Sequence, residues 1–212
     1  QNHRMKTLTA LFAVLALFAS SAQANPLADF QSRVQADLIK PFALDLGGVL
    51  GGASAHTGRA LGMPGFWAGV VGSVQMRPDK ADRILNNAGV KAFGVPMIEV
   101  GVGLPFKFDV IVHGVKAYDA AIFGGGLRYG LYKTGLVTTF LPNVSISAFG
   151  DKVNHKYFNA THGALNATAT WNLPVVKPFF VAGYDLTEVK VGAATTAGVA
   201  GMKATARGSR FS

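Results

Sequence analysis

The stretch Ile98-Glu99-Val100-Gly101-Val102-Gly103-Leu104 places a branched apolar residue at every second position, with glutamate or glycine between. After Pro105 the alternation continues, with apolar residues at 106, 108, 110 and 112. A third run, from Phe123 to Tyr132, sets large apolar residues against glycine and arginine. Side chains alternate between the two faces of a strand, so each run predicts one apolar face and one face of charged or small residues.

The small residues of these runs bear on which face meets solvent. In a soluble sheet the apolar face is packed inside, whereas in a membrane barrel it meets lipid and the polar face lines the lumen. Many polar-face positions here are glycine, which is a poor choice for a solvated strand. The pattern therefore favours an all-β fold, an antiparallel transmembrane β-barrel.

Other segments alternate in the same way: 42–56, 66–76, 143–149, 157–172, 180–187 and 203–209. The first five of them complete a set of eight expected strands, and the last begins a ninth. Bacterial single-chain barrels have even strand numbers and must close, because lipid cannot satisfy an open edge. Two interpretations stay open: eight strands with a tail, or a fragment of a barrel of ten or more strands. Residues 150–156 are expected to form a polar loop.

The N-terminus has the order of a secretory signal peptide. Residues 1–4 precede Met5 and are interpreted as upstream or read-through residues. A positive Lys6 is followed by a short apolar core and by Ala22-Gln23-Ala24, the small-residue cleavage pattern. The apolar run is too short to cross ~30 Å of hydrocarbon as a helix. We therefore expect a signal peptide over residues 5–24, cleavage between Ala24 and Asn25, and export to the bacterial outer membrane.

An amphipathic helix is predicted over residues 25–41. Asn25 can cap it, and Pro26 suits the first helical position. Its apolar residues recur at three- and four-residue spacing: Leu27, Phe30, Val34 and Leu38. Pro41 is expected to end the helix. It serves either as a plug or lid, or as packing across the mouth of a barrel formed by residues 42–212.

Chargeable side chains fall on the polar faces of the predicted strands: Glu99, Lys107, Asp109, His113, Arg128, His162 and Asp185. Small barrels fill their interiors with side chains, so we expect these charges to pair across the lumen and hold the strands in register. The alternative is that they line a narrow polar conduit or a ligand pocket.

No motif specifies a catalytic, metal or cofactor site. The chain lacks a G-x-S-x-G elbow around Ser145 or Ser147, and its histidines lack metal-ligand spacing. The glycines at 124–126 lie within a strand, without the lysine and helix of a phosphate loop. The absence of cysteine excludes disulfides and thiolate chemistry. We expect no enzymatic activity, no cofactor and no metal.

The distribution of charge bears on one class of partner, nucleic acid. The 20 basic and 11 acidic residues give a formal net charge of +9. The basic residues are scattered singly rather than in runs, so the sequence does not indicate binding of nucleic acid.

Residues 27–191 resemble outer-membrane β-barrel proteins of Gram-negative bacteria. The resemblance rests on the signal peptide and on EVGVGLPFKFDVIVHG (99–114), FGGGLRYGLY (123–132) and LPNVSISA (141–148). Their order is similar to that of an uncharacterised family of predicted outer-membrane barrels, and distantly, in style, to that of long-chain fatty acid transporters. It implies contact with outer-membrane lipid and passive passage or uptake of a small or hydrophobic molecule. Two alternatives stay open: a structural or adhesion barrel, and a secreted soluble barrel that binds a small apolar ligand.

Overall fold

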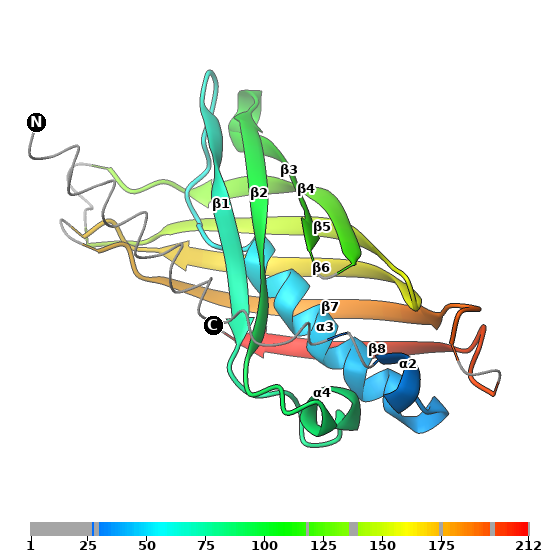
Figure 1. Ribbon diagram of the computed structural model, residues 1–212. Helices are drawn as coiled ribbons and strands as arrows, with labels where there is room; N and C mark the ends of the chain where they lie inside the picture. Colours follow the sequence, from blue (N-terminus) through cyan, green and yellow to red (C-terminus); the bar gives the residue numbers. More distant parts are fainter. Residues whose placement is uncertain are drawn as a thin grey trace, which may run out of the picture.

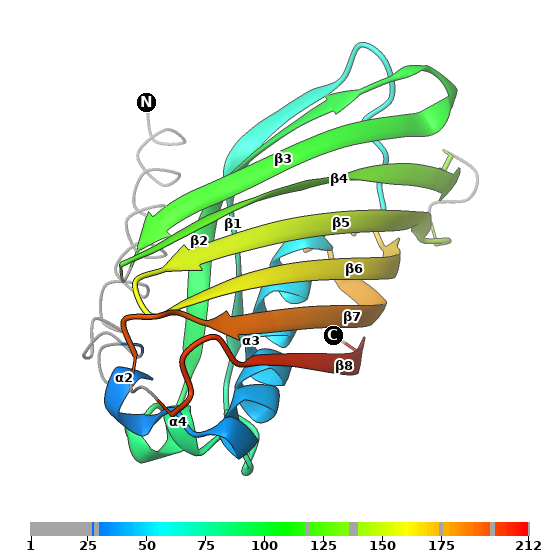
Figure 2. The same cartoon turned by 90° about the vertical axis from the view of Figure 1, so that its right-hand side faces the viewer.

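A computed structural model describes the chain over residues 27, 30–117, 119–135, 140–173, 176–195 and 198–211, the side chain of Ser54 excepted. In it, a curved antiparallel sheet wraps around a helix that lies against its inner face (Figures 1 and 2). The predicted upstream residues, the signal peptide and the cleavage position lie outside the described residues.

The sheet is built from consecutive strands: β1 (Phe66–Gln75), β2 (Phe93–Gly103), β3 (Phe108–Ala117), β4 (Ala120–Tyr132), β5 (Asn143–His155), β6 (Phe158–Thr170), β7 (Phe179–Val191) and β8 (Lys203–Phe211). Each strand pairs with the next in the chain, so the spatial order is the sequence order. Among the described residues β1 and β8 do not pair, and the sheet is therefore open. The prediction of an antiparallel all-β fold is confirmed, whereas closure into a barrel is not shown.

The helical elements are α2 (Phe30–Arg33), η1 (Ala36–Leu38), α3 (Ile39–Ser54), α4 (Arg83–Asn87) and the short turn η2 (Pro105–Lys107). In the part of the chain that the structure describes, no helix combines the length and the apolar character needed to cross a bilayer.

The long helix is where the expected order of elements was wrong. A helix ending at Pro41 and a first strand over 42–56 were predicted, but α3 runs from Ile39 to Ser54. Pro41 lies in its first turn, where the missing N–H would have had no helical partner. Paired glycines at 47–48 and 51–52 imitate a weak strand pattern, whereas the buried apolar residues follow a helical period: Phe42, Leu46, Val49, Leu50 and Ala53.

α3 lies inside the curve of the sheet and contacts β1, β2, β7 and β8 (Figures 1 and 2). An apolar core fills the end of the interior near α2 and α4. At its centre the rings of Phe30, Phe42 and Phe158 lie 4.9–5.2 Å apart, centroid to centroid. Such aromatic pairs add to the stabilisation from burial alone. The first turns of α3 are therefore anchored in this core.

Candidate functional site

A row of polar residues crosses the inner face of the sheet at one level. We call it the polar belt; its members are Glu99, His113, Gly124, Asp151, His162 and Thr187. Consecutive members lie directly opposite one another across β2 to β7. All their side chains are buried. The two-residue period of the strands and the register of the sheet thus place alternating acidic and basic groups side by side in the interior.

Gly124 is the one member of the belt without a side chain, and the space beside it is occupied by its neighbours. His113 Nε2 on β3 lies 2.5 Å from Asp151 Oδ1 on β5, so the two side chains meet across the intervening strand β4. A methyl group at position 124 would collide with both of these atoms. Glycine at this position therefore permits a buried acid–base contact between strands that are not neighbours.

Arg128 and Asp109 form an ion pair closer to the end of the strands that lies away from α2 and α4. Arg128 Nε donates to Asp109 Oδ2 at 2.9 Å, and the two residues face each other across β3 and β4. Asp109 also accepts from the backbone N–H groups of Leu61, at 3.0 Å, and Gly62, at 3.3 Å. Because Asp109 is fully buried, this carboxylate ties the loop before β1 to the inner wall of the sheet.

The third cluster joins the belt to the last strand. His162 Nδ1 lies 3.0 Å from Thr187 Oγ1, and its Nε2 lies 3.7 Å from Asp185 Oδ1. Arg210 on β8 approaches Asp185 at 3.5 Å and donates to Asn166 Oδ1 at 2.5 Å. The cluster leaves several buried polar atoms without a hydrogen-bond partner, among them Asp185 Oδ1 and His162 Nε2.

His56 extends the belt at its other end, after α3. Its Nε2 lies 3.5 Å from Glu99 Oε1. Burial, and then the charge of Arg128, lowers the pKa of His56 to about 4. His56 is therefore neutral at pH 7, and its approach to Glu99 is not an ion pair at that pH.

The structure brings six of the seven charged residues singled out from the sequence into the interior: Glu99, Asp109, His113, Arg128, His162 and Asp185. Lys107 is not among them. It is exposed in η2, because Phe106 and Lys107 take positive φ values of 61° and 65° and β3 begins only at Phe108. The strand alternation that placed Lys107 beside Asp109 does not extend into this turn.

Sequence reasoning missed other members of the interior network: His56, Asp151, Asn166, Thr187 and Arg210. Asp151 was lost because residues 150–156 were expected to form a loop, whereas β5 continues to His155. The signal was present, since Asp151, Val153 and His155 alternate with Lys152 and Asn154.

The described contacts of this interior are charge pairs and hydrogen bonds between side chains. Ser145 Oγ is buried without a hydrogen-bond partner, while His113 and His162 are engaged with Asp151 and Thr187. Over the described ranges, no three His, Cys, Asp or Glu side chains gather as a metal site would require.

A separate acidic pair lies outside the strands, where Asp45 on α3 faces the start of α4. Asp82 caps α4 by accepting from the N–H of Leu85 at 3.1 Å. Burial raises the pKa of Asp82 from 3.8 to about 7, and the charge of Asp45 adds to this effect. Asp45, which accepts from Gln75 at 2.6 Å, also has a pKa raised by burial.

We expect Asp82→Asn to flatten the dependence of stability on pH. The folded protein holds a proton on Asp82 up to about pH 7, while the unfolded chain releases it near 3.8. The stability linked to this proton is complete below the lower value and is lost as the pH rises through the higher one. The variant keeps the capping oxygen but not the titration. Between pH 5 and 8 its unfolding free energy should fall by about 2–3 kcal/mol less than that of the parent.

Denaturant titrations at several pH values would measure this difference. Asp37→Asn, at an exposed aspartate in η1, is the control and should leave the pH profile of the parent unchanged. A parental slope retained in Asp82→Asn would contradict the assignment.

Comparison with known protein families, curated protein sequences and solved structures yields no match.

Proposed function

We propose that this protein is a membrane-embedded β-sheet protein of the bacterial outer membrane, exported by a cleavable signal peptide, which serves the passive passage or uptake of a small molecule. The observation that carries the proposal is the inverted polarity of the sheet. Its buried face holds the polar belt and two ion-paired clusters, while its outer face exposes large apolar side chains.

The outer apolar side chains occupy every strand. Examples are Val70, Ile98, Val110, Leu127, Ile146, Leu165, Leu186 and Phe211, each at least 38% exposed. A soluble protein rarely presents so much contiguous apolar surface without a partner. In a membrane barrel such residues face the acyl chains, and the polar residues face the lumen. The apolar outer face argues against the soluble alternative, which needs a polar exterior.

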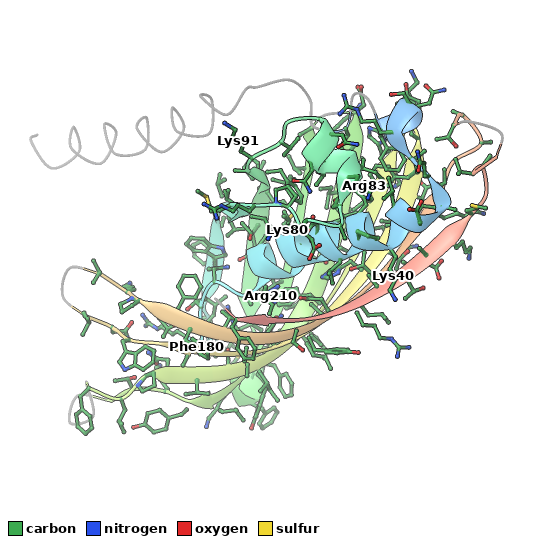
Figure 3. The ribbon with its side chains drawn as sticks, turned by 90° about the horizontal axis from the view of Figure 1, so that it is seen from below. Lys40, Lys80, Arg83, Lys91, Phe180 and Arg210 are labelled. Atoms are coloured by element: carbon green, nitrogen blue, oxygen red, sulfur yellow. The ribbon has the colours of Figure 1, made fainter. Side chains whose placement is uncertain are left out.

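The two ends of the strands differ in a way that supports a bilayer orientation. Outward charges gather at the end near α2 and α4: Lys116, Lys152, Glu188, Lys190 and Lys203. Figure 3 shows Lys40, Lys80, Arg83 and Lys91 around the helices of this end, with Phe180 toward the other. Exposed aromatic residues collect at that other end: Phe66, Phe106, Phe108, Tyr132, Phe179, Phe180 and Phe211. Aromatic girdles mark the interfaces of membrane barrels.

The polar interior favours a small polar solute over a hydrophobic one as the molecule that passes. Uptake of a hydrophobic ligand would need a continuous apolar path. In the interior, the apolar cavity beside Phe42 and Phe158 holds only about 40 Å³; a larger apolar hollow, of about 640 Å³, lies on the outer face beside Leu127 and Leu165. A structural or adhesion role, without passage, is the remaining alternative and is separated from passage by flux measurements.

Cysteine scanning tests the orientation directly, because the chain contains no cysteine. Leu165 and Thr161 both face outward on β6; Thr161 lies between Lys152 and Glu188 in the charged rim, whereas Leu165 lies in the apolar band. After reconstitution into vesicles, a fluorophore on Leu165→Cys should be quenched by lipid-borne nitroxide and shielded from aqueous iodide. A fluorophore on Thr161→Cys should show the reverse preference.

The matched position makes the outcome decisive, since both labels occupy the same face of one strand. Equal access of iodide to the two labels, or recovery of the protein without detergent, would show that the apolar face does not meet lipid.

A further inference from the structure

We propose that α3 is a displaceable plug, whose C-terminal half moves away from the sheet to uncover the polar interior while its first turns stay anchored. The proposal goes beyond the passive path described above and rests on it only for the flux that the movement would control. Three features of the contact between α3 and the sheet point to it.

The first feature is the face that α3 presents to the wall. Its glycines pack directly on polar side chains of the sheet: Gly47 on Thr187 and His162, Gly48 on Gln75, Gly51 on Asp185 and Arg210, and Gly52 on Ser73. A methyl group at Gly51 would collide with Asp185 Oδ1 and Arg210 Nη1. The C-terminal half of the helix therefore covers the end of the polar belt. Its backbone lies so close to the side chains of the sheet that only glycine fits between them.

The second feature is that this cover leaves polar groups unsatisfied. Asp185 Oδ1, His162 Nε2 and Arg210 Nε and Nη1 are buried and make no hydrogen bond. His162 Nε2 and Arg210 Nη1 meet Asp185 only at 3.7 and 3.5 Å, longer than hydrogen bonds, so hydrogen bonds of these atoms do not secure the cover. Four glycines in sixteen residues also weaken the helix itself.

The third feature is the uneven anchoring of α3. Phe42, in its first turns, is held between the rings of Phe30 and Phe158. The buried apolar side chains of the other half are the smaller Val49, Leu50 and Ala53. Along the helix, between β1 and β8, lies a cavity of about 460 Å³, lined by Leu44, Asp45 and Gly48 and by residues 206–210 of β8. This space is on the unpaired side of the sheet, where no strand among the described residues bars the helix. A pivot near Phe42 would swing the glycine half of the helix toward it.

A reversible disulfide can test the movement. A Cβ at Gly47 would lie 3.3 Å from Cβ of Thr187, close to the separation in disulfides, and the chain has no other cysteine. The lock is Gly47→Cys with Thr187→Cys. A second pair, Gly150→Cys with Gly163→Cys, joins β5 to β6 at directly opposed positions and leaves α3 free. For each variant, the oxidised protein is compared with the reduced protein.

Two readouts separate the plug from the proposed passage. In proteoliposomes, we expect oxidation of the α3 lock to reduce the influx of a small zwitterion, glycine, at least tenfold, with recovery after reduction. The β5–β6 pair should show no such change. In detergent, Ser73→Cys, on β1 beneath Gly52 of α3, is added to each pair and its alkylation is followed by peptide mass spectrometry. Alkylation at 73 should be at least tenfold slower when α3 is locked.

The outcomes are distinct. Slower alkylation without any glycine influx in either state would support the movement of α3 and overturn the proposed passage. Alkylation at 73 that is equally slow, or equally fast, in the oxidised and reduced lock would overturn the plug, whether or not the protein conducts.

Discussion

Arg128→Met is expected to lower the free energy of unfolding by about 3–5 kcal/mol, because it leaves the carboxylate of Asp109 buried without its counter-charge. Asp109 is fully buried, and Arg128 Nε lies 2.9 Å from its Oδ2. Methionine matches the length of the arginine stem but carries neither charge nor donor. Urea titration of the refolded protein, followed by circular dichroism, would measure the loss.

The control is the same kind of substitution at a solvated pair. Lys203 Nζ lies 3.1 Å from Glu188 Oε1, with both side chains about half exposed, at 56% and 47%. Exposed pairs contribute about 0–1 kcal/mol, so Lys203→Met should shift the urea midpoint little. Equal losses in the two variants would mean that burial of Asp109 does not raise the cost of removing its counter-charge.

Gly124→Ala is expected to cost about 2–4 kcal/mol, although it adds only a methyl group. That group would occupy the space through which His113 reaches Asp151, so one of the two side chains must turn away and lose its partner. The loss is smaller than for Arg128→Met because both partners remain and can find part of their hydrogen bonding elsewhere. The same urea titration would measure it.

Gly150→Ala is the matched substitution, on the outer face of the neighbouring strand β5. A methyl group there would have its nearest neighbour at 3.9 Å, the carbonyl oxygen of His162. The change should therefore lie within about 0.5 kcal/mol of the parent. Tolerance of alanine at both positions would show that the contact between His113 and Asp151 does not depend on the gap at Gly124.

The alternation of residue types determined the sheet. From Ile98 to Tyr132 it specified strands, their antiparallel succession and the two unlike faces, because side-chain direction in a strand depends only on position in the sequence. It also placed six of the seven selected charges on the buried face. Lys107 departed from this pattern because the positive φ values of η2 interrupt the two-residue period, a backbone choice that composition does not reveal.

Tertiary structure decided the remainder. The paired glycines of residues 42–56 fit a strand pattern and a helix pattern equally well. Contacts with β1, β7 and β8 decide for the helix, because a glycine-rich helix is stable only when it packs closely against other elements. The polar belt likewise required the register of six strands, which brings together residues as distant in the chain as Glu99 and Thr187. A local pattern can state which way a side chain points. Only the packed sheet determines which side chain it meets, because that depends on pairing between segments that are far apart in sequence.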